Sequence, residues 1–385
     1  MTMSRPGFAA MALGFVAPLV FAAETPEVPH RLWVYIGTYT AGASEGIYRL
    51  SFDARTGQLG QPELAAKAGN PSFLALHPAK PLLYAVGEAG EKLDGVTGFL
   101  VDPQSGELTQ LNRVPSVGRG PCHITVAPGG RYAAVANYSG GSIAVLPLRE
   151  DGVLGEASAF VQHTGSSVNP QRQREAHAHS VNFDPSGRFL FAADLGTDQI
   201  MIYRFDEAHG TLEPNDPASV QLAPGAGPRH FALHPSGKFA YVINELDNTI
   251  TAFAFDPATG RLDAVHSVST LPEEFTGESY TAEIKVHPSG RFVYGSNRGH
   301  DSIAIFAVDP ASGVLTPAGW ASTQGKAPRH FNMEPAGQFL IAANQDSDSL
   351  VVFRIDPASG ALNATGQAVI VPTPVCVVFR PVPAN

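Results

Sequence analysis

Short apolar runs separated by turn residues repeat along the whole chain. Residues 227–262 contain one complete unit, in which one run ends at 234 and two others span 239–243 and 249–255. The runs are rich in β-branched and aromatic side chains and are bounded by Gly, Pro, Ser, Asn or Asp. Runs of this length and composition predict β-strands joined by tight turns.

Two turn motifs set the register of this repeat. A proline ahead of the first turn recurs every 46 to 57 residues, at Pro78, Pro128, Pro185, Pro235, Pro288, Pro335 and Pro381. A later turn begins with Asp and ends with Gly, as at 256–260, 309–313 and 356–360. Asp accepts hydrogen bonds from the backbone of such a turn, and Gly adopts φ > 0 without steric cost. A repeated four-stranded unit of about fifty residues is typical of a β-propeller blade.

We therefore predict an all-β, seven-bladed propeller with four antiparallel strands per blade. The last repeat has only a first strand, at 373–379, whereas the start of the chain supplies runs at 33–39, 46–52 and 59–66 that match the other three. We expect the N-terminal strands to pair with the C-terminal strand, which closes the ring and hides its sheet edges. The alternative is an open β-solenoid.

The N-terminal segment, residues 1–22, resembles a secretory signal peptide. Arg5 is its only charged side chain, residues 8–21 are apolar, and Ala22 is a small residue at the expected cleavage position. We expect a periplasmic protein in which residues 23–385 form one propeller domain; the alternative is a retained N-terminal anchor. The formal net charge of −10 argues against nucleic-acid or anionic-membrane partners. We expect no membrane association after cleavage and no required protein partner.

Cysteine and histidine spacing gives no sign of a metal site. The two cysteines, Cys122 and Cys376, lie on predicted first strands of blades that are not neighbours, which favours free thiols. No Cys/His spacing fits a zinc site, and we expect neither a metal nor a cofactor.

One mouth of the channel is predicted to collect the polar side chains. The first two strands of each blade are antiparallel, so residues before the first strand and after the second share one face, where small-molecule sites form. Two polar insertions, 162–178 and 271–281, lie in connections on this face. The expected substrate-binding residues at these positions are His123, Asn137, His177, His230, Asn244, Glu283, Asn297, Arg329, His330, Asn344 and Gln345.

Several of these positions have a structural alternative. An Asn at the end of a second strand can satisfy the backbone of the following turn, and Arg229 and Arg329 recur within Pro-Arg-His copies of the repeat. Glu245, Glu283 and Arg298 instead interrupt the repeat, which favours a functional role. The histidines of the His-Pro turns belong to the opposite face and are expected to be structural: His77, His234 and His287.

The segments 227–253 and 280–306, together with YIGTYT at 35–40, resemble the seven-bladed propeller lactonase family. This family contains bacterial 6-phosphogluconolactonases and fungal carboxymuconate lactonising enzymes, and the resemblance covers roughly residues 31–385. In the muconate enzymes a His, two Arg and a Glu are thought to line the site. By motif, the resemblance places these catalytic residues at His179, Arg229, Glu245 and Arg298.

The resemblance and the N-terminal segment together predict an exported sugar lactonase that converts D-glucono-1,5-lactone to gluconate. Glu245 or His179 would take a proton from the attacking water, and Arg229 and Arg298 would stabilise the oxyanion. The alternatives are a 6-phosphogluconolactonase, a muconate-type cycloisomerase, and a non-catalytic periplasmic binding propeller.

Overall fold

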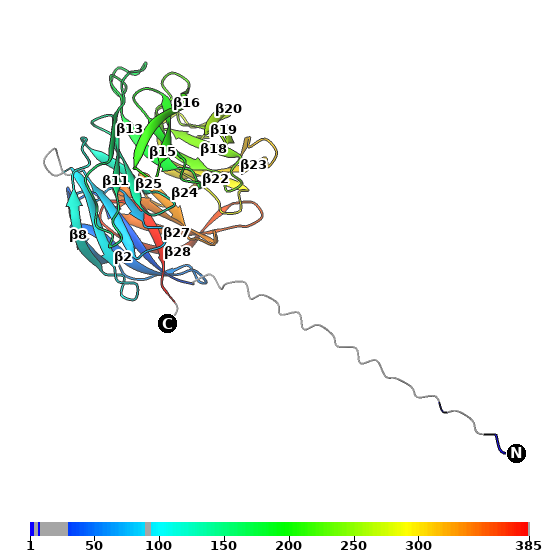
Figure 1. Ribbon diagram of the computed structural model, residues 1–385. Helices are drawn as coiled ribbons and strands as arrows, with labels where there is room; N and C mark the ends of the chain where they lie inside the picture. The colour runs from blue at the N-terminus through cyan, green and yellow to red at the C-terminus, as the bar shows by residue number, and fades with distance from the viewer. Residues whose placement is uncertain (4–6, 8–29, 89–93, 384–385) are drawn as a thin grey trace.

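The predicted strand repeat folds into a ring of antiparallel sheets in the computed structural model, which describes residues 1–3, 7, 30–88 and 94–383. Seven sheets surround a common axis (Figure 1), which confirms the seven-bladed propeller. The predicted signal peptide lies outside the described residues, except for residues 1–3 and 7. No helix in the described part of the chain has the length and apolar character needed to cross a bilayer.

Each blade contains four strands, numbered here from the channel outwards. Blade 1 consists of β5 (Leu74–Leu76), β6 (Leu82–Gly87), β7 (Gly95–Val101) and β8 (Leu108–Val114). Blade 2 consists of β9 (Pro121–Val126), β10 (Tyr132–Asn137), β11 (Ser142–Pro147) and β12 (Ala159–Gln162). Blade 3 consists of β13 (Ala178–Phe183), β14 (Phe189–Asp194), β15 (Gln199–Asp206) and β16 (Thr211–Gln221).

The remaining blades follow the same order. Blade 4 consists of β17 (Pro228–Leu233), β18 (Phe239–Asn244), β19 (Thr249–Asp256) and β20 (Arg261–Ser269). Blade 5 consists of β21 (Tyr280–Val286), β22 (Phe292–Arg298), β23 (Ser302–Val308) and β24 (Leu315–Ser322). Blade 6 consists of β25 (Pro328–Met333), β26 (Phe339–Asn344), the short 3-10 helix η1 (Gln345–Ser347), β27 (Ser349–Ile355) and β28 (Leu362–Ile370).

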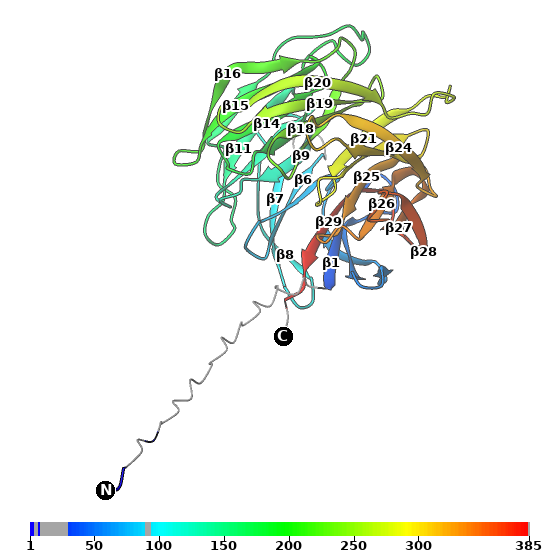
Figure 2. The same cartoon turned by 90° about the vertical axis from the view of Figure 1, so that its right-hand side faces the viewer.

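Blade 7 is assembled from both ends of the chain. Its inner strand is β29 (Pro374–Pro381), followed outwards by β1 (Arg31–Thr38), β2 (Gly46–Asp53) and a divided fourth strand, β3 (Gln58–Leu59) and β4 (Glu63–Lys67). The β29–β1 ladder runs antiparallel from Leu32↔Pro381 to Thr38↔Pro374, and Figure 2 shows the two strands side by side. Every inner strand contacts the inner strands of both neighbouring blades. The ring therefore closes as predicted.

The hydrophobic core is divided into layers between adjacent blades. Each inner and second strand is covered on both faces, so β14, β18 and β26 are buried along their whole length. Between blades 6 and 7, for example, Val34 and Ile36 of β1 share a cluster with Ile341 and Phe339 of β26. Because both faces of these strands are buried, they are continuously apolar rather than alternating.

Hydrogen bonds from repeated side chains also join neighbouring blades. His234 Nε2–H donates to the Gly290 carbonyl of the next blade at 2.7 Å, while its Nδ1 accepts the Ser236 N–H at 3.1 Å. Equivalent bonds to the next blade are made by His77 and His287. This placement agrees with a structural role for the His-Pro turns, on the face opposite the predicted mouth.

The glycine that ends each Asp-initiated turn is required by its close approach to the preceding blade. Gly313 has φ of 73°, and a Cβ built there would lie 2.5 Å from Cδ1 of Phe239. Its carbonyl also accepts a hydrogen bond from the Tyr241 hydroxyl at 3.1 Å. The turn motif therefore serves packing between blades as well as the local reversal of the chain.

Removal of residues 372–385 tests the closure of the ring. It deletes β29, exposes the β1 edge and leaves the inner face of blade 7 uncovered, so we expect aggregation or a large fall in melting temperature. Calorimetry and light scattering measure these outcomes. The control removes only residues 383–385, which follow the strand. A 372–385 deletion that melts like the full chain would contradict pairing of the two termini.

Candidate active site

A polar pocket of about 340 Å³ opens at the predicted mouth of the channel. It is lined by Glu88, Gly120, Cys122, Tyr138, Ser139, Arg172, His179, Glu245, Arg298 and Arg329. A narrower hollow continues beneath it and adds Tyr39, Ser72, Phe73, Arg229, His230, His330 and Val375. Ionisable side chains from several blades therefore meet in one depression.

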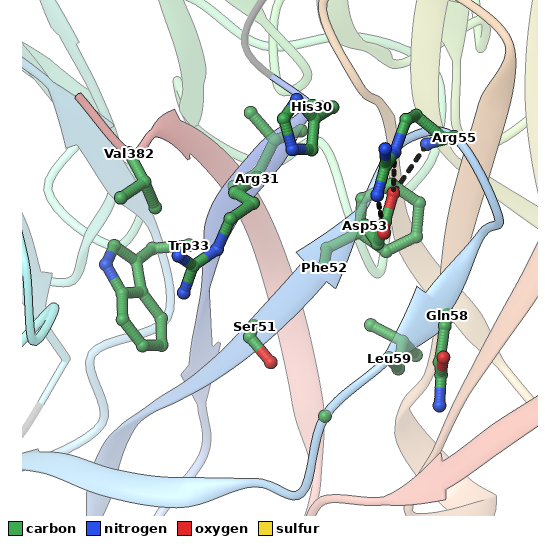
Figure 3. Close-up of a pocket in the computed structure, with 12 residues that line it drawn as sticks. His30, Arg31, Trp33, Ser51, Phe52, Asp53, Arg55, Gln58, Leu59 and Val382 are labelled. Atoms are coloured by element: carbon green, nitrogen blue, oxygen red, sulfur yellow. Dashed lines mark hydrogen bonds and ion pairs between the residues drawn. The ribbon is translucent and has the colours of Figure 1, made fainter. Parts of the chain in front are cut away.

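Another hollow of about 250 Å³ lies on the opposite face, against β1, β2 and β3 (Figure 3). The ion pair drawn there joins Asp53 to Arg55 at 3.3 Å, and the arginine is 68% exposed. This pair is largely solvated and contributes little energy. With no buried charged group among its lining residues, this hollow is a weaker candidate for catalysis than the mouth.

One set of pocket residues directly follows the second strands. Glu88 follows β6, Tyr138 follows β10 and Glu245 follows β18, while Arg298 is the last residue of β22. At this point the chain leaves the second strand, which is packed between neighbouring sheets. The side chain therefore turns into the mouth instead of the core.

A second set occupies β-bulges in the inner strands. The pairing of β13 with β14 skips His179, the pairing of β17 with β18 skips Arg229, and the pairing of β25 with β26 skips Arg329. A bulge adds one unpaired residue to a strand and redirects its side chain. The same local device therefore aims an imidazole and two guanidinium groups into the mouth.

Glu245 binds three guanidinium groups at the wall of the pocket. Its Oε2 lies 2.9 Å from Arg229 Nε and 3.1 Å from Arg298 Nη2, and its Oε1 lies 2.8 Å from Arg172 Nη2. Burial favours the neutral acid, but Arg298, Arg229 and Arg172 outweigh burial and lower the pKa of Glu245 to about 2. The carboxylate is thus permanently ionised near neutral pH and is a weak proton acceptor.

His179 lies beside this cluster, with Nε2 3.9 Å from Glu245 Oε2. Its ring meets Tyr138 and His230 edge-on. Burial, followed by repulsion from Arg229, holds the pKa of His179 well below its ordinary value. The imidazole is therefore neutral at pH 7 and able to accept a proton. His179 is thus the uncharged one of the two predicted candidates for the base, and Glu245 is the ionised one.

Arg329 differs from the other guanidinium groups of the mouth. In the described chain no carboxylate bonds to it; its Nη2 donates to the Tyr39 hydroxyl at 3.0 Å, and its guanidinium stacks over the Tyr39 ring at 5.4 Å. A stacked guanidinium with unused donors is well suited to hold an anion.

The floor of the pocket is a ring of aromatic and imidazole groups around Glu283. Arg229 Nη1 donates to His230 Nε2 at 3.2 Å, so the His230 proton is on Nδ1, which donates to Glu283 Oε2 at 3.1 Å. His330 accepts the Val377 N–H on Nδ1 at 3.2 Å and donates from Nε2 to the same carboxylate oxygen at 2.9 Å. A chain of hydrogen bonds therefore links Glu283 to Arg229 through His230, and Glu283 itself does not line the pocket.

His123 completes this floor and does not reach the upper pocket. Its ring lies 4.1 Å from the Phe73 ring and 5.3 Å from the His230 ring, measured between centroids. His177 supports the rim: its Nδ1–H donates to the Tyr138 carbonyl at 3.0 Å, and its ring stacks on Tyr138. Both histidines contact pocket residues, but neither lines the main pocket.

The four predicted asparagines are not among the residues that line the pocket. Asn297 Nδ2 donates to the Thr270 carbonyl at 2.9 Å and to Ser302 Oγ at 3.3 Å. The other three make comparable bonds to hydroxyl or carbonyl groups near their own turns: Asn137, Asn244 and Asn344. Their amides hold the turn after the second strand, as the structural alternative proposed.

Gln345 is also outside the pocket. It lies in η1, where its side-chain amide donates to Asp346 at 3.1 Å. Its predicted contact with substrate stays a prediction.

Arg172 is a pocket residue that was not among the predicted site residues. Arg172 comes from the insertion at 162–178 and donates to Tyr138 Oη at 3.2 Å as well as to Glu245. The insertion itself was the available signal, because additional residues on this face often shape a site.

Cys122 also lines the pocket, and both it and buried Cys376 are free thiols. Burial raises the pKa of the Cys122 thiol, which disfavours a nucleophilic thiolate.

The comparisons with known proteins agree with this geometry. The family described as "Lactonase, 7-bladed beta-propeller" matches residues 33–379. The chain therefore belongs to the seven-bladed β-propeller lactonase family and is a lactone hydrolase. No group of three or more His, Cys, Asp or Glu side chains arranged to hold a metal occurs among the described residues.

Individual relatives cover nearly the whole chain. It is 41% identical to the 6-phosphogluconolactonase of Bacillus subtilis over 345 residues, which is 90% of this chain and 97% of that relative. It is 33% identical to the 6-phosphogluconolactonase of Formosa agariphila over 307 residues, 78% of this chain and 86% of the relative. The solved structure of the Pseudomonas aeruginosa periplasmic gluconolactonase is 39% identical to this chain, with a TM-score of 0.87 over 92% of this chain and 100% of that one.

Replacing Glu245 with Gln removes the counter-ion shared by three arginines. We expect kcat to fall by about 10²-fold or more, because the guanidinium groups lose their fixed orientation. The folded pKa of about 2 lies below the unfolded value of about 4.3. The stabilising contribution of Glu245 is therefore complete above the unfolded value and disappears as pH falls toward 2.

Calorimetry of the wild type and Glu245→Gln at pH 7, 4 and 3 measures this dependence. The difference in melting temperature should be largest at pH 7 and shrink as the pH falls. Glu156→Gln, at an exposed carboxylate, is the matched control and should show little difference. A Glu245→Gln deficit that is independent of pH would contradict the ion-pair assignment.

Glu283→Gln tests the positioning of Arg229 through the floor. The Gln amide carries no negative charge, and its NH2 group cannot accept the Ile284 N–H as Glu283 Oε1 does, so His230 and then Arg229 should lose orientation. We expect kcat to fall about tenfold, equivalent to roughly one charge-assisted hydrogen bond, with a smaller change in KM. Steady-state kinetics measures both constants. A loss confined to KM would instead indicate that Glu283 contacts the substrate.

Proposed function

We propose that the protein hydrolyses a phosphorylated aldonolactone, most simply 6-phospho-D-glucono-1,5-lactone. The observation that carries this proposal is the excess of positive charge in the pocket. Arg172, Arg229 and Arg298 share the single carboxylate of Glu245, and Arg329 is held by the neutral hydroxyl of Tyr39. An anionic substituent on the substrate would complement this excess, and guanidinium groups suit phosphate.

Two of the relatives support the same substrate class. The Bacillus subtilis and Formosa agariphila proteins are both named 6-phosphogluconolactonases. The names of these relatives favour hydrolysis over the muconate-type cyclisation. Membership of a lactonase family sets aside the non-catalytic binding propeller.

In the proposed reaction, water attacks the lactone carbonyl carbon and passes a proton to neutral His179. Glu245, 3.9 Å from the imidazole, stabilises the imidazolium that forms. Arg298 lines the pocket, and burial lowers its pKa only to about 10, so it remains charged at neutral pH. It is therefore placed to stabilise the developing oxyanion, an effect often worth about 3 kcal/mol.

A second candidate is D-glucono-1,5-lactone itself, hydrolysed outside the inner membrane. The 39% identity to a periplasmic gluconolactonase and the apolar N-terminal segment favour it. Phosphorylated sugars are intracellular metabolites, so an exported enzyme would meet the unphosphorylated lactone instead. On this candidate the protein is periplasmic, and the guanidinium groups bind ring hydroxyls and the carbonyl.

Substrate comparison with Arg329→Met separates the two candidates. For a phosphorylated lactone we expect KM to rise about tenfold or more with a smaller change in kcat, because the variant loses an ionic contact to the phosphate. The effect on gluconolactone should be much smaller. Rates are measured above spontaneous hydrolysis, with Arg329→Lys as the charge-retaining control. A wild type that prefers unphosphorylated lactone, and a variant that affects both substrates equally, would overturn the phosphorylated assignment.

A further inference from the structure

The pocket contains a second carboxyl group, Glu88, on the side away from Glu245. Glu88 directly follows β6 of blade 1, and Glu245 directly follows β18 of blade 4. These are equivalent positions in blades that lie across the seven-sheet ring from each other. Both carboxyl groups line the same pocket, so the substrate would lie between them.

The position of Glu88 is built by a dedicated network. Ser72 Oγ donates a hydrogen bond to Glu88 Oε1. Asn70 accepts the Glu88 N–H at 3.2 Å through its backbone carbonyl and donates from Nδ2 to the Glu88 carbonyl at 2.8 Å. Asn70 is itself held by the Thr40 N–H at 2.7 Å. Glu88 is thus fixed at both its backbone and its side chain.

The surroundings of the two carboxyl groups differ sharply. Burial raises the pKa of Glu88, which Ser72, Arg329 and Arg229 only partly offset, and Asp94 raises it further. Tyr39 and Cys122 also face Glu88. Glu245, in contrast, is held ionised by three arginines. When the environments of two carboxyl groups shift their pKa values in opposite directions, the two groups are commonly the acid and the base of one reaction, or the acid and its electrostatic partner.

Lactone hydrolysis also requires a proton donor at the ring oxygen of the substrate. When the bond between the carbonyl carbon and the ring oxygen breaks, the ring oxygen leaves as an alkoxide, which is a poor leaving group unless it is protonated. His179 can accept a proton from water, and the arginines can stabilise the oxyanion. None of the guanidinium groups readily gives up a proton.

We propose that Glu88 is the general acid of the reaction and that Ser72 is its positioning residue. Water adds to the carbonyl carbon as its proton passes to His179; the bond from that carbon to the ring oxygen then breaks, and the ring oxygen takes the proton of the Glu88 carboxyl. The Glu88 carboxylate recovers a proton from the His179 imidazolium through water, and the product acid releases one proton to solvent. The proposal rests on lactone hydrolysis and is independent of whether the substrate is phosphorylated.

A sulphur analogue of the substrate tests this role directly. In a 1,5-thiolactone the leaving group is a thiolate, which is far less basic than an alkoxide and needs no general acid. Glu88→Gln keeps the size and the acceptor for Ser72 but carries no acidic proton. We expect its kcat on the oxygen lactone to fall about 10²-fold or more and its kcat on the thiolactone to change little. Glu156→Gln, at an exposed carboxylate, is the matched control.

The pH dependence of the unmodified protein provides a second measurement that does not rely on folding of a variant. Wild-type kcat on the oxygen lactone should decline with rising pH as Glu88 ionises, and this decline should be absent with the thiolactone. Ser72→Ala should move that alkaline limb without abolishing turnover. Equal losses on both substrates in Glu88→Gln, or identical pH profiles for the two substrates in the wild type, would overturn the proposal. Wild-type turnover of each lactone, measured first, reports separately on the substrate assignment.

Discussion

Pairing between the last strand of the chain and the first is the constraint on which the site depends. β29 and β1 complete blade 7, and only a closed ring brings the inner strands to a common mouth. The bond from Arg329 to Tyr39 joins residues 290 positions apart in sequence. The entropic cost of closing such a loop grows only logarithmically with its length, whereas closure gains a full strand ladder and two inter-blade core layers.

The second constraint is the burial of charged arginines, and it is met because several of them share the carboxylate of Glu245. Desolvating a guanidinium group is costly unless a carboxylate or other acceptors compensate it. Arg229 meets this requirement fully, since it bonds to Glu245, to the Ala282 carbonyl at 2.6 Å and to His230. Arg298 bonds to the Thr281 carbonyl and to Glu245, but its buried Nε has no partner in the described chain.

The repeat made the fold predictable from sequence, because its turn residues perform the same inter-blade contacts in successive blades. Of the four residues that the family resemblance places at the catalytic centre, His179, Glu245 and Arg298 line the pocket and Arg229 lines the hollow beneath it, and antiparallel strand geometry explains why they lie together. The asparagines and Gln345 do not line the pocket, because a position at a strand end does not reveal whether its side chain turns into the mouth or back to its own loop. Arg172 was missed for a different reason: its place depends on the path of an insertion that has no counterpart in the repeat. The roles of the individual residues in catalysis remain predictions.

Packing constrains the residues at one end of each blade more than those at the other, and this difference explains why the functional site forms at the mouth. At the His-Pro face, side chains such as His234 bond to the next blade, so the residue is dictated by packing. At the mouth, the bulge residue and the strand-end residue are outside both the ladder and the core, so each blade can carry a different group without loss of structure. Blade 4 uses both places for an ion pair, Arg229 and Glu245. Blade 1 places Glu88 beside the neutral hydroxyl of Ser72. The bulge and strand-end positions therefore give the mouth a charged wall at blade 4 and a weakly charged wall at blade 1. A reaction with separate proton-accepting and proton-donating steps requires this asymmetry.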